Sequence, residues 1–156
     1  MGLFGVDTVM VRTTDTDFGS GDTIRGRKAA DIHWRAELVN SFVEPVYIAI
    51  HQNTFSESKY SGAQVFYGNN EQGMVLADIV QERLKQNLNP ANMRKTKPAS
   101  SVYIMENIEC IAVLVECGFI SNFTEEQLLL TPQYQTKIAM SITQAYLYYG
   151  RGQELT

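Results

Sequence analysis

The sequence predicts a single α/β domain in which a mostly parallel, twisted sheet is flanked by helices. Segments with a strand pattern alternate along the chain with segments that have a helix pattern. Residues 46–50 and 111–115 are apolar at every position, so both faces of each strand must be covered by other parts of the protein. A length of 156 residues suits one domain with its own core.

The first half of the chain contains four predicted elements. Val9 and Val11 alternate with less apolar neighbours, which predicts a strand over 7–12. Apolar residues then recur at steps of three and four over 25–42, which predicts an amphipathic helix whose apolar stripe is Ala29, Ile32, Ala36, Val39 and Phe42. The buried strand 46–50 follows, and the Val and aromatic residues of 63–67 predict a second, shorter strand.

The second half begins with a clear helix, because Leu76, Val80, Leu84 and Leu88 fall every four residues before Pro90. A polar, basic loop is expected over 89–100, followed by strands over 102–105 and 111–115. Caps at 121–124 predict a short helix, and the apolar spacing after residue 132 predicts a last one, with Ile138, Ile142, Ala145 and Tyr149 on one face. We assign 1–150 to the domain and 151–156 to a C-terminal tail.

Composition excludes several classes of protein. The 13 Lys and Arg residues against 17 Asp and Glu give a net charge of −4, which argues against nucleic acid as a partner. No apolar stretch approaches the ~20 residues that cross a membrane.

The first residues lack a signal-peptide pattern, so any export signal is expected upstream. Cys110 and Cys117 would lie about 20 Å apart along a strand, which predicts free thiols.

Two residues that carry chemistry follow the two buried strands. His51 comes directly after 46–50, and Glu116 comes directly after 111–115. Ligands of such sheets bind beyond the carboxyl ends of the strands, where an imidazole beside a carboxylate suits a hydrolytic metal site. The structural alternative is that Glu116 is a helix N-terminal carboxylate and His51 a satisfied loop histidine. The pattern alone leaves both readings open.

Four ordered motifs carry a resemblance to a known family. They are residues 48–53 (IAIHQN), 62–67 (GAQVFY), 92–97 (NMRKTK) and 114–122 (LVECGFISN). Together they closely resemble the zinc-dependent N-acetylmuramoyl-L-alanine amidases of the type 3 family, especially its sporulation and cell-wall branch. The resemblance implies an α/β fold, an autolysin-like peptidoglycan hydrolase that cleaves between N-acetylmuramic acid and L-alanine, and an extracellular or cell-wall location.

The resemblance also implies roles for individual residues. His51 matches a zinc-binding histidine of the family, and Glu116 matches its catalytic carboxylate. The family's other two ligands, a histidine in a His-Gly-Gly segment and a glutamate, match nothing here. We therefore expect the chain to lack the family's N-terminal strand and helix, and its zinc site to be incomplete. His33 is expected at the surface and Cys117 as a small buried thiol, so neither is a replacement ligand.

Substrate-binding residues are expected on the same side of the sheet. Arg94 and Lys97 are cations on a loop near the strand ends, where they would hold carboxylates of the stem peptide. The alternative is that this loop is simply a solvated basic segment. Asn53, in the first motif, is expected to contact the muramyl peptide as well.

The function predicted from the sequence is thus zinc-dependent cleavage of peptidoglycan by an N-terminally shortened amidase. A non-catalytic cell-wall-binding remnant of the same fold is the alternative. An unrelated α/β module with a small-molecule site is disfavoured by the four ordered motifs. Metal content separates the first two possibilities, because only the enzyme needs the metal.

Overall fold

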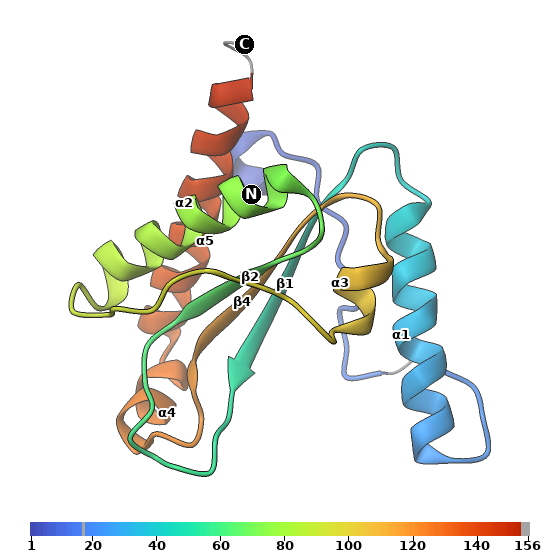
Figure 1. Cartoon of the computed structure of the whole chain (residues 1–156), viewed down its shortest axis with the longest axis horizontal. Helices are drawn as coiled ribbons and strands as arrows, with labels where there is room; N and C mark the ends of the chain where they lie inside the picture. Colours follow the sequence, from blue (N-terminus) through green and yellow to red (C-terminus); the bar gives the residue numbers. More distant parts are fainter. Residues whose placement is uncertain (17, 154–156) are drawn as a thin grey trace.

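The computed structural model describes residues 1–16 and 18–153, and a four-stranded sheet lies at its centre. Figure 1 shows this sheet between the helices. The sheet order is β1–β4–β2–β3, with β1 at Val46–Asn53, β4 at Ile111–Phe119, β2 at Gln64–Tyr67 and β3 at Lys97–Pro98. β1 and β4 are parallel, as are β2 and β3, whereas β2 runs antiparallel to β4. The α/β class is confirmed, with one antiparallel pairing inside the sheet.

Helices cover both faces of this sheet (Figure 1). On one face lie α2 (Glu71–Leu88) and α5 (Pro132–Gln153), whose buried residues form the larger core with Val65, Val113 and Val115. On the other face lie α1 (Ile24–Asn40) and α3 (Tyr103–Asn107), which pack over Ala49, Ala112 and Leu114. The short α4 (Phe123–Leu129) follows the end of β4.

The two helices of the larger core form as the sequence predicts. The Asn70 side chain caps α2 by accepting a 2.8 Å hydrogen bond from the Gln72 N–H. The predicted stripe of α2 is completely buried at Leu76, Val80 and Leu84. The predicted face of α5 is buried at all four positions, which are Ile138, Ile142, Ala145 and Tyr149. Both helices therefore form because their apolar stripes are covered by the sheet and by each other.

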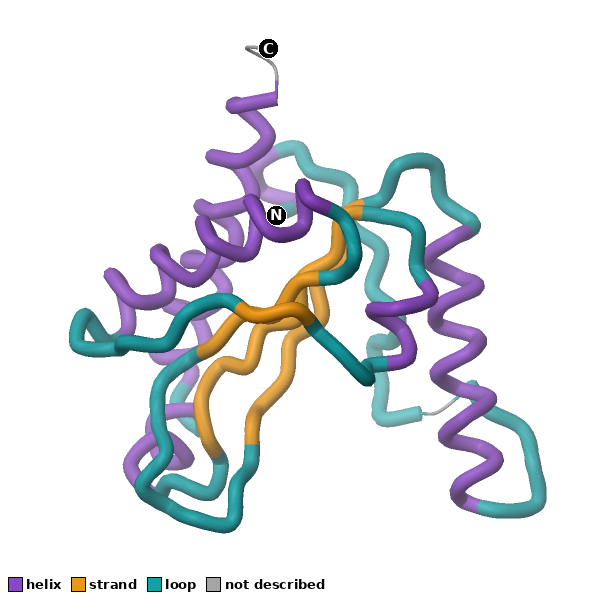
Figure 2. Tube along the Cα trace, viewed as in Figure 1, coloured by secondary structure: helices purple, strands orange, loops and turns teal. Residues whose placement is uncertain are grey.

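The N-terminal segment departs from the prediction. Residues 7–12 are coil and not a strand, as Figure 2 shows. Val9 is 63% exposed and Met10 is 70% exposed. A strand needs a neighbour that satisfies its backbone donors and acceptors, and no described strand pairs with this segment. The alternation of Val9 and Val11 is therefore not enough to make this segment a strand.

The predicted strand 102–105 is also wrong, because these residues begin the helix α3. Ser101 precedes the helix with a left-handed φ of 66°, and its N–H donates to Oε1 of Glu106 at 2.7 Å. Met105 is buried under α1, and Asn40 of α1 donates to the Asn107 carbonyl at 3.0 Å. A short apolar run cannot distinguish a strand from a buried helical turn.

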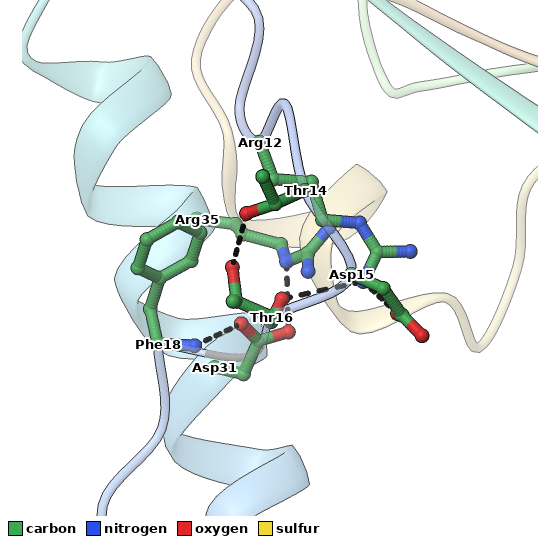
Figure 3. Close-up of polar contacts among 7 residues, drawn as sticks. All are labelled: Arg12, Thr14, Asp15, Thr16, Phe18, Asp31 and Arg35. Carbon is green, nitrogen blue, oxygen red and sulfur yellow. Dashed lines mark hydrogen bonds and ion pairs between the residues drawn. The ribbon is translucent and has the colours of Figure 1, made fainter.

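The apolar stripe of α1 is only partly buried. Ala36 and Val39 are buried as expected, whereas Ala29, Ile32 and Phe42 are exposed. In the first half of the helix, polar contacts of Asp31 stand where apolar packing was expected (Figure 3). Asp31 accepts hydrogen bonds from the Phe18 N–H at 3.0 Å and from Arg35 Nε at 2.8 Å. These bonds fasten the segment before α1 to the helix.

Electrostatics at Asp31 favour its charged form. Burial acts to raise the pKa of this carboxyl, but the Phe18 N–H and the Arg35 guanidinium outweigh burial, so the net pKa is lowered. Arg12 adds a further favourable charge nearby. Asp31 is therefore a structural anchor between two segments of the chain.

The remaining predictions concern the cysteines, the tail and membranes. Cys110 and Cys117 are free and buried, as expected. The helix α5 continues to Gln153, so residues 151–153 of the expected tail are helical, and 154–156 lie outside the described residues. None of the helices in the described part of the chain has the length and apolarity that crossing a membrane requires.

Candidate functional site

One row of side chains crosses three neighbouring strands. His51 of β1 is in register with Glu116 of β4, which is in register with Gln64 of β2. Neighbouring strands are about 4.8 Å apart, and residues in register point to the same face of a sheet. This face is the one on which Leu114 packs under α1 and α3. The predicted proximity of His51 and Glu116 is confirmed.

Both residues lie inside their strands and not just beyond them. β1 continues two residues past His51 to Asn53, and β4 continues to Phe119. The register shifts between His51 and Asn53, so Asn53 pairs with Phe119. The Asn53 carbonyl accepts a 2.9 Å hydrogen bond from the Ile120 N–H. This places Asn53, half-buried, at the end of the strand pair, and its predicted contact with substrate stays a prediction.

Glu116 is a carboxylate in an unfavourable environment. Its Oε2 atom is buried and has no hydrogen-bond partner within the described part of the chain. Burial raises the pKa of the Glu116 carboxyl. A carboxylate with a raised pKa and an unsatisfied oxygen is a better proton acceptor than an exposed one. The structural alternative, a helix N-terminal carboxylate, does not hold, because Glu116 lies within β4.

His51 is exposed as a residue, but its ring is partly desolvated. Partial burial lowers the pKa of the imidazole, and the positive charge of Arg35 on α1 lowers it further. The neutral ring is the form that binds a metal or accepts a hydrogen bond. In the part of the chain that the structure describes, the His51 ring makes no hydrogen bond, so it offers a ring nitrogen beside Glu116. Its assignment as a ligand stays a prediction.

The other candidate ligands are engaged elsewhere. His33 lies on α1, exposed, with Nδ1 2.9 Å from the Tyr103 hydroxyl. Cys117 is 2% exposed and packs in the core on the opposite face of the sheet, where burial raises the pKa of its thiol to about 12. Among residues 1–16 and 18–153, no group of three or more His, Cys, Asp or Glu side chains is placed to hold a metal ion.

Arg94 is held next to the row of side chains. Its Nε donates to the Ser61 carbonyl at 2.7 Å, and its Nη1 donates to Oε1 of Gln64 at 3.1 Å. The guanidinium also lies over the Phe119 ring, 4.6 Å from the ring centroid. Gln64 is 5% exposed and donates to the Lys95 carbonyl, so the amide is held from both sides. The structure therefore brings Arg94 to the site through Gln64.

Lys97 takes a different position from Arg94. It lies on the edge strand β3, in register with Phe66, and is exposed. It does not line the cavity of about 400 Å³ that opens beside Arg94. That cavity is lined by two short segments, residues 59–62 and 91–94, together with Asn89. The carboxylate-binding role predicted for Lys97 stays a prediction. The cations that line the cavity are Arg94 and Lys59.

Sequence reasoning did not identify Glu125 or the role of Gln64. Glu125 is buried in α4 and accepts backbone N–H groups from Gly62 and Phe119, both at 2.8 Å. The Asn122 cap three residues earlier, predicted as one of several, accepts the Glu125 N–H at 3.1 Å. A carboxylate in a helix first turn suggests interaction with the helix dipole, but nothing local indicates which distant N–H groups it reaches.

Comparison with known proteins gives a consistent result. A family model described as N-acetylmuramoyl-L-alanine amidase matches residues 3–147. A germination-specific N-acetylmuramoyl-L-alanine amidase of Bacillus subtilis (strain 168) is 38% identical over 148 residues. The alignment covers 93% of this chain and 62% of that relative, so the chain spans less than two thirds of the relative's length.

Solved structures agree with the sequence comparison. The CwlD amidase from Clostridioides difficile, solved in complex with the GerS lipoprotein, has a TM-score of 0.87 and 32% identity. The match covers 90% of this chain and 74% of that chain. The amidase Ami1 from Mycobacterium smegmatis has a TM-score of 0.78 at 21% identity, covering 95% of this chain and 68% of that one, which is a likeness in fold alone.

Proposed function

The chain belongs to the N-acetylmuramoyl-L-alanine amidase family, and we propose that it hydrolyses the amide between N-acetylmuramic acid and L-alanine in peptidoglycan. The observation that carries this proposal is the pair of His51 and Glu116 on neighbouring strands, with Oε2 of Glu116 buried and unpaired among the described residues. The proposed place of action is the cell wall or its extracellular surroundings, where this substrate lies.

Glu116 is the proton carrier of the proposed reaction. It accepts a proton from the water that attacks the lactyl carbonyl carbon, and a carbon–oxygen bond forms. When the carbon–nitrogen bond breaks, Glu116 returns the proton to the departing L-alanine nitrogen, which leaves as an amine. The raised pKa of Glu116 supports this role, because an acid–base group works best with a pKa near the working pH.

His51 is proposed as a metal ligand, although the described residues do not complete a zinc site. A catalytic zinc ion needs three protein ligands and a water, and it supplies charge stabilisation and an activated water when it is bound. The described residues place only His51 and Glu116 together, with no group of three candidate ligands. The zinc dependence of the reaction is part of the proposal.

A second function, binding to the cell wall without catalysis, is favoured by the incomplete set of zinc ligands among the described residues. A cell-wall-binding protein would keep the substrate face of the fold and dispense with the metal ligands. The absence of a three-ligand group among the described residues agrees with this alternative. The two functions differ in one observable property, which is whether the bound muramyl peptide is cleaved.

The test is incubation of the purified chain with a muramyl peptide, with and without added zinc, followed by mass spectrometry. The amidase proposal expects a released peptide that begins with a free L-alanine amine, together with an unmodified N-acetylmuramic acid carboxyl. Binding without release in either condition would reject the amidase and favour the binding protein. Cleavage at any other bond would reject both.

A further inference from the structure

The cavity beside Arg94 is positively charged. Its lining includes the cations Lys59 and Arg94 and no acidic residue. Lys59 is exposed and its ammonium pairs with Glu57, which offsets part of its charge. Arg94 makes no ion pair with a carboxylate in the part of the chain that the structure describes. Arg94 is therefore the cation of this lining that has no carboxylate partner among the described residues.

Among the residues that the structure describes, the groups that hold Arg94 in place are all neutral. Two of its nitrogens donate to the Ser61 carbonyl and to the Gln64 amide oxygen, and its plane lies over the Phe119 ring. These contacts fix the guanidinium without neutralising it. Its Nη2 donates to no protein atom within the described residues. A fixed guanidinium with free N–H groups is well suited to bind a carboxylate, because little side-chain freedom is lost on binding.

The walls of the cavity are also tied together. Gly62 has a φ of +95°, and a Cβ at this position would lie 2.7 Å from Oδ1 of Asn92. The Gly62 N–H donates to buried Glu125, and Asn92 donates to the Ala63 carbonyl, both at 2.8 Å. Only glycine fits this turn. The cavity is therefore formed before any ligand arrives, as binding sites usually are.

The cavity lies one strand away from the proposed reaction centre. Arg94 contacts Gln64, and Gln64 is in register with Glu116. A peptide whose first amide lies at Glu116 reaches the cavity within a few residues, because an extended chain advances about 3.3 Å per residue. We propose that this cavity binds a free carboxylate of the stem peptide and so selects it over the amidated form. The proposal rests on the amidase function.

The test is calorimetric binding of two muramyl peptides that differ only in a stem-peptide carboxylate or carboxamide. We expect the carboxylate form to bind about tenfold more tightly, the effect of one charge-assisted hydrogen-bonded pair. Arg94→Gln should abolish this preference, and Arg94→Lys should retain part of it. The matched control is Lys95→Gln, since Lys95 is an exposed neighbour whose side chain does not line the cavity.

Each outcome decides the proposal. Equal affinity of the two peptides for the unsubstituted chain would overturn it, and this comparison needs no variant to fold. Loss of the preference in Lys95→Gln as well as Arg94→Gln would overturn it too, because general charge would then explain the effect. A peptide that is bound with the preference but not hydrolysed would reject the amidase function and keep the cavity as a carboxylate site. Hydrolysis without a preference for the carboxylate peptide would reject only the carboxylate-binding role of the cavity.

Discussion

Removal of the Glu125 carboxylate should destabilise the fold more than removal of any neighbouring charge on α4. Glu125 is 9% exposed, and its two oxygens accept one backbone N–H each, from Gly62 and Phe119. These bonds join the loop before β2 to the end of β4. Glu125→Ala leaves both buried N–H groups without a partner, because alanine has no acceptor.

The expected loss follows from the two hydrogen bonds. An unsatisfied buried donor costs roughly 1–3 kcal/mol, so the variant should lose about 2–6 kcal/mol of unfolding free energy. That is a large share of the roughly 5–15 kcal/mol that stabilises a typical domain. The expected value lies in the lower half of the range, because Gly62 lines the open cavity and water from it can enter the space that the removed carboxylate leaves.

Urea unfolding followed by circular dichroism measures this loss. With a slope of about 2 kcal/mol per molar urea, the middle of the usual range, a loss of about 2–4 kcal/mol should lower the midpoint by roughly 1–2 M. The matched control is Glu126→Ala, which removes the same charge from the same helix turn but no side-chain hydrogen bond of the described structure. Its loss should stay below about 1 kcal/mol, the size of a helix-dipole effect. Equal losses in the two variants would refute the reasoning.

Three further predictions concern other parts of the chain. The lowered pKa of Asp31 means that its hydrogen bonds stabilise the fold above pH ~4 and are lost as the pH falls through the folded pKa. The difference in unfolding free energy between the native chain and Asp31→Asn, measured in urea, should therefore shrink from pH 7 to pH 3. A constant difference would contradict this prediction. Ile50 is 59% exposed on β1, whose outer edge has no described partner strand, so the native chain should self-associate there and Ile50→Lys should reduce this in sedimentation; an unchanged profile would contradict it. Zinc should be lost on dialysis, because no three-ligand group is described, and stoichiometric zinc by elemental analysis would contradict that.

The sequence predicts best where the pattern is long and regular. The four-residue spacing of Leu76, Val80 and Leu84 predicts α2, and these residues are completely buried. The apolar runs of β1 and β4 predict a pair of covered parallel strands, which places His51 beside Glu116. The position of His51 beside Glu116 is predictable because it depends only on which strands are neighbours.

Other features depend on contacts that no local pattern reveals. Val9 alternates like a strand residue, but no strand in the described part of the chain pairs with it. Met105 belongs to a short apolar run that packs as a helical turn. The position of Arg94 requires β2 to run antiparallel to β4, which brings Gln64 into register with Glu116. That direction of β2 cannot be predicted from the alternation of four residues.

The central claim is that Glu116 carries the proton in amide hydrolysis, and Glu116→Gln tests it most directly. Turnover of a muramyl peptide should fall by at least ~100-fold, the effect of losing a general base. The fold should be unharmed, because the raised pKa of Glu116 means that its charge opposes folding once pH rises through that pKa, and glutamine carries none. Urea stability at neutral pH should therefore equal or exceed that of the native chain. Near-native turnover in a folded Glu116→Gln protein would contradict the claim.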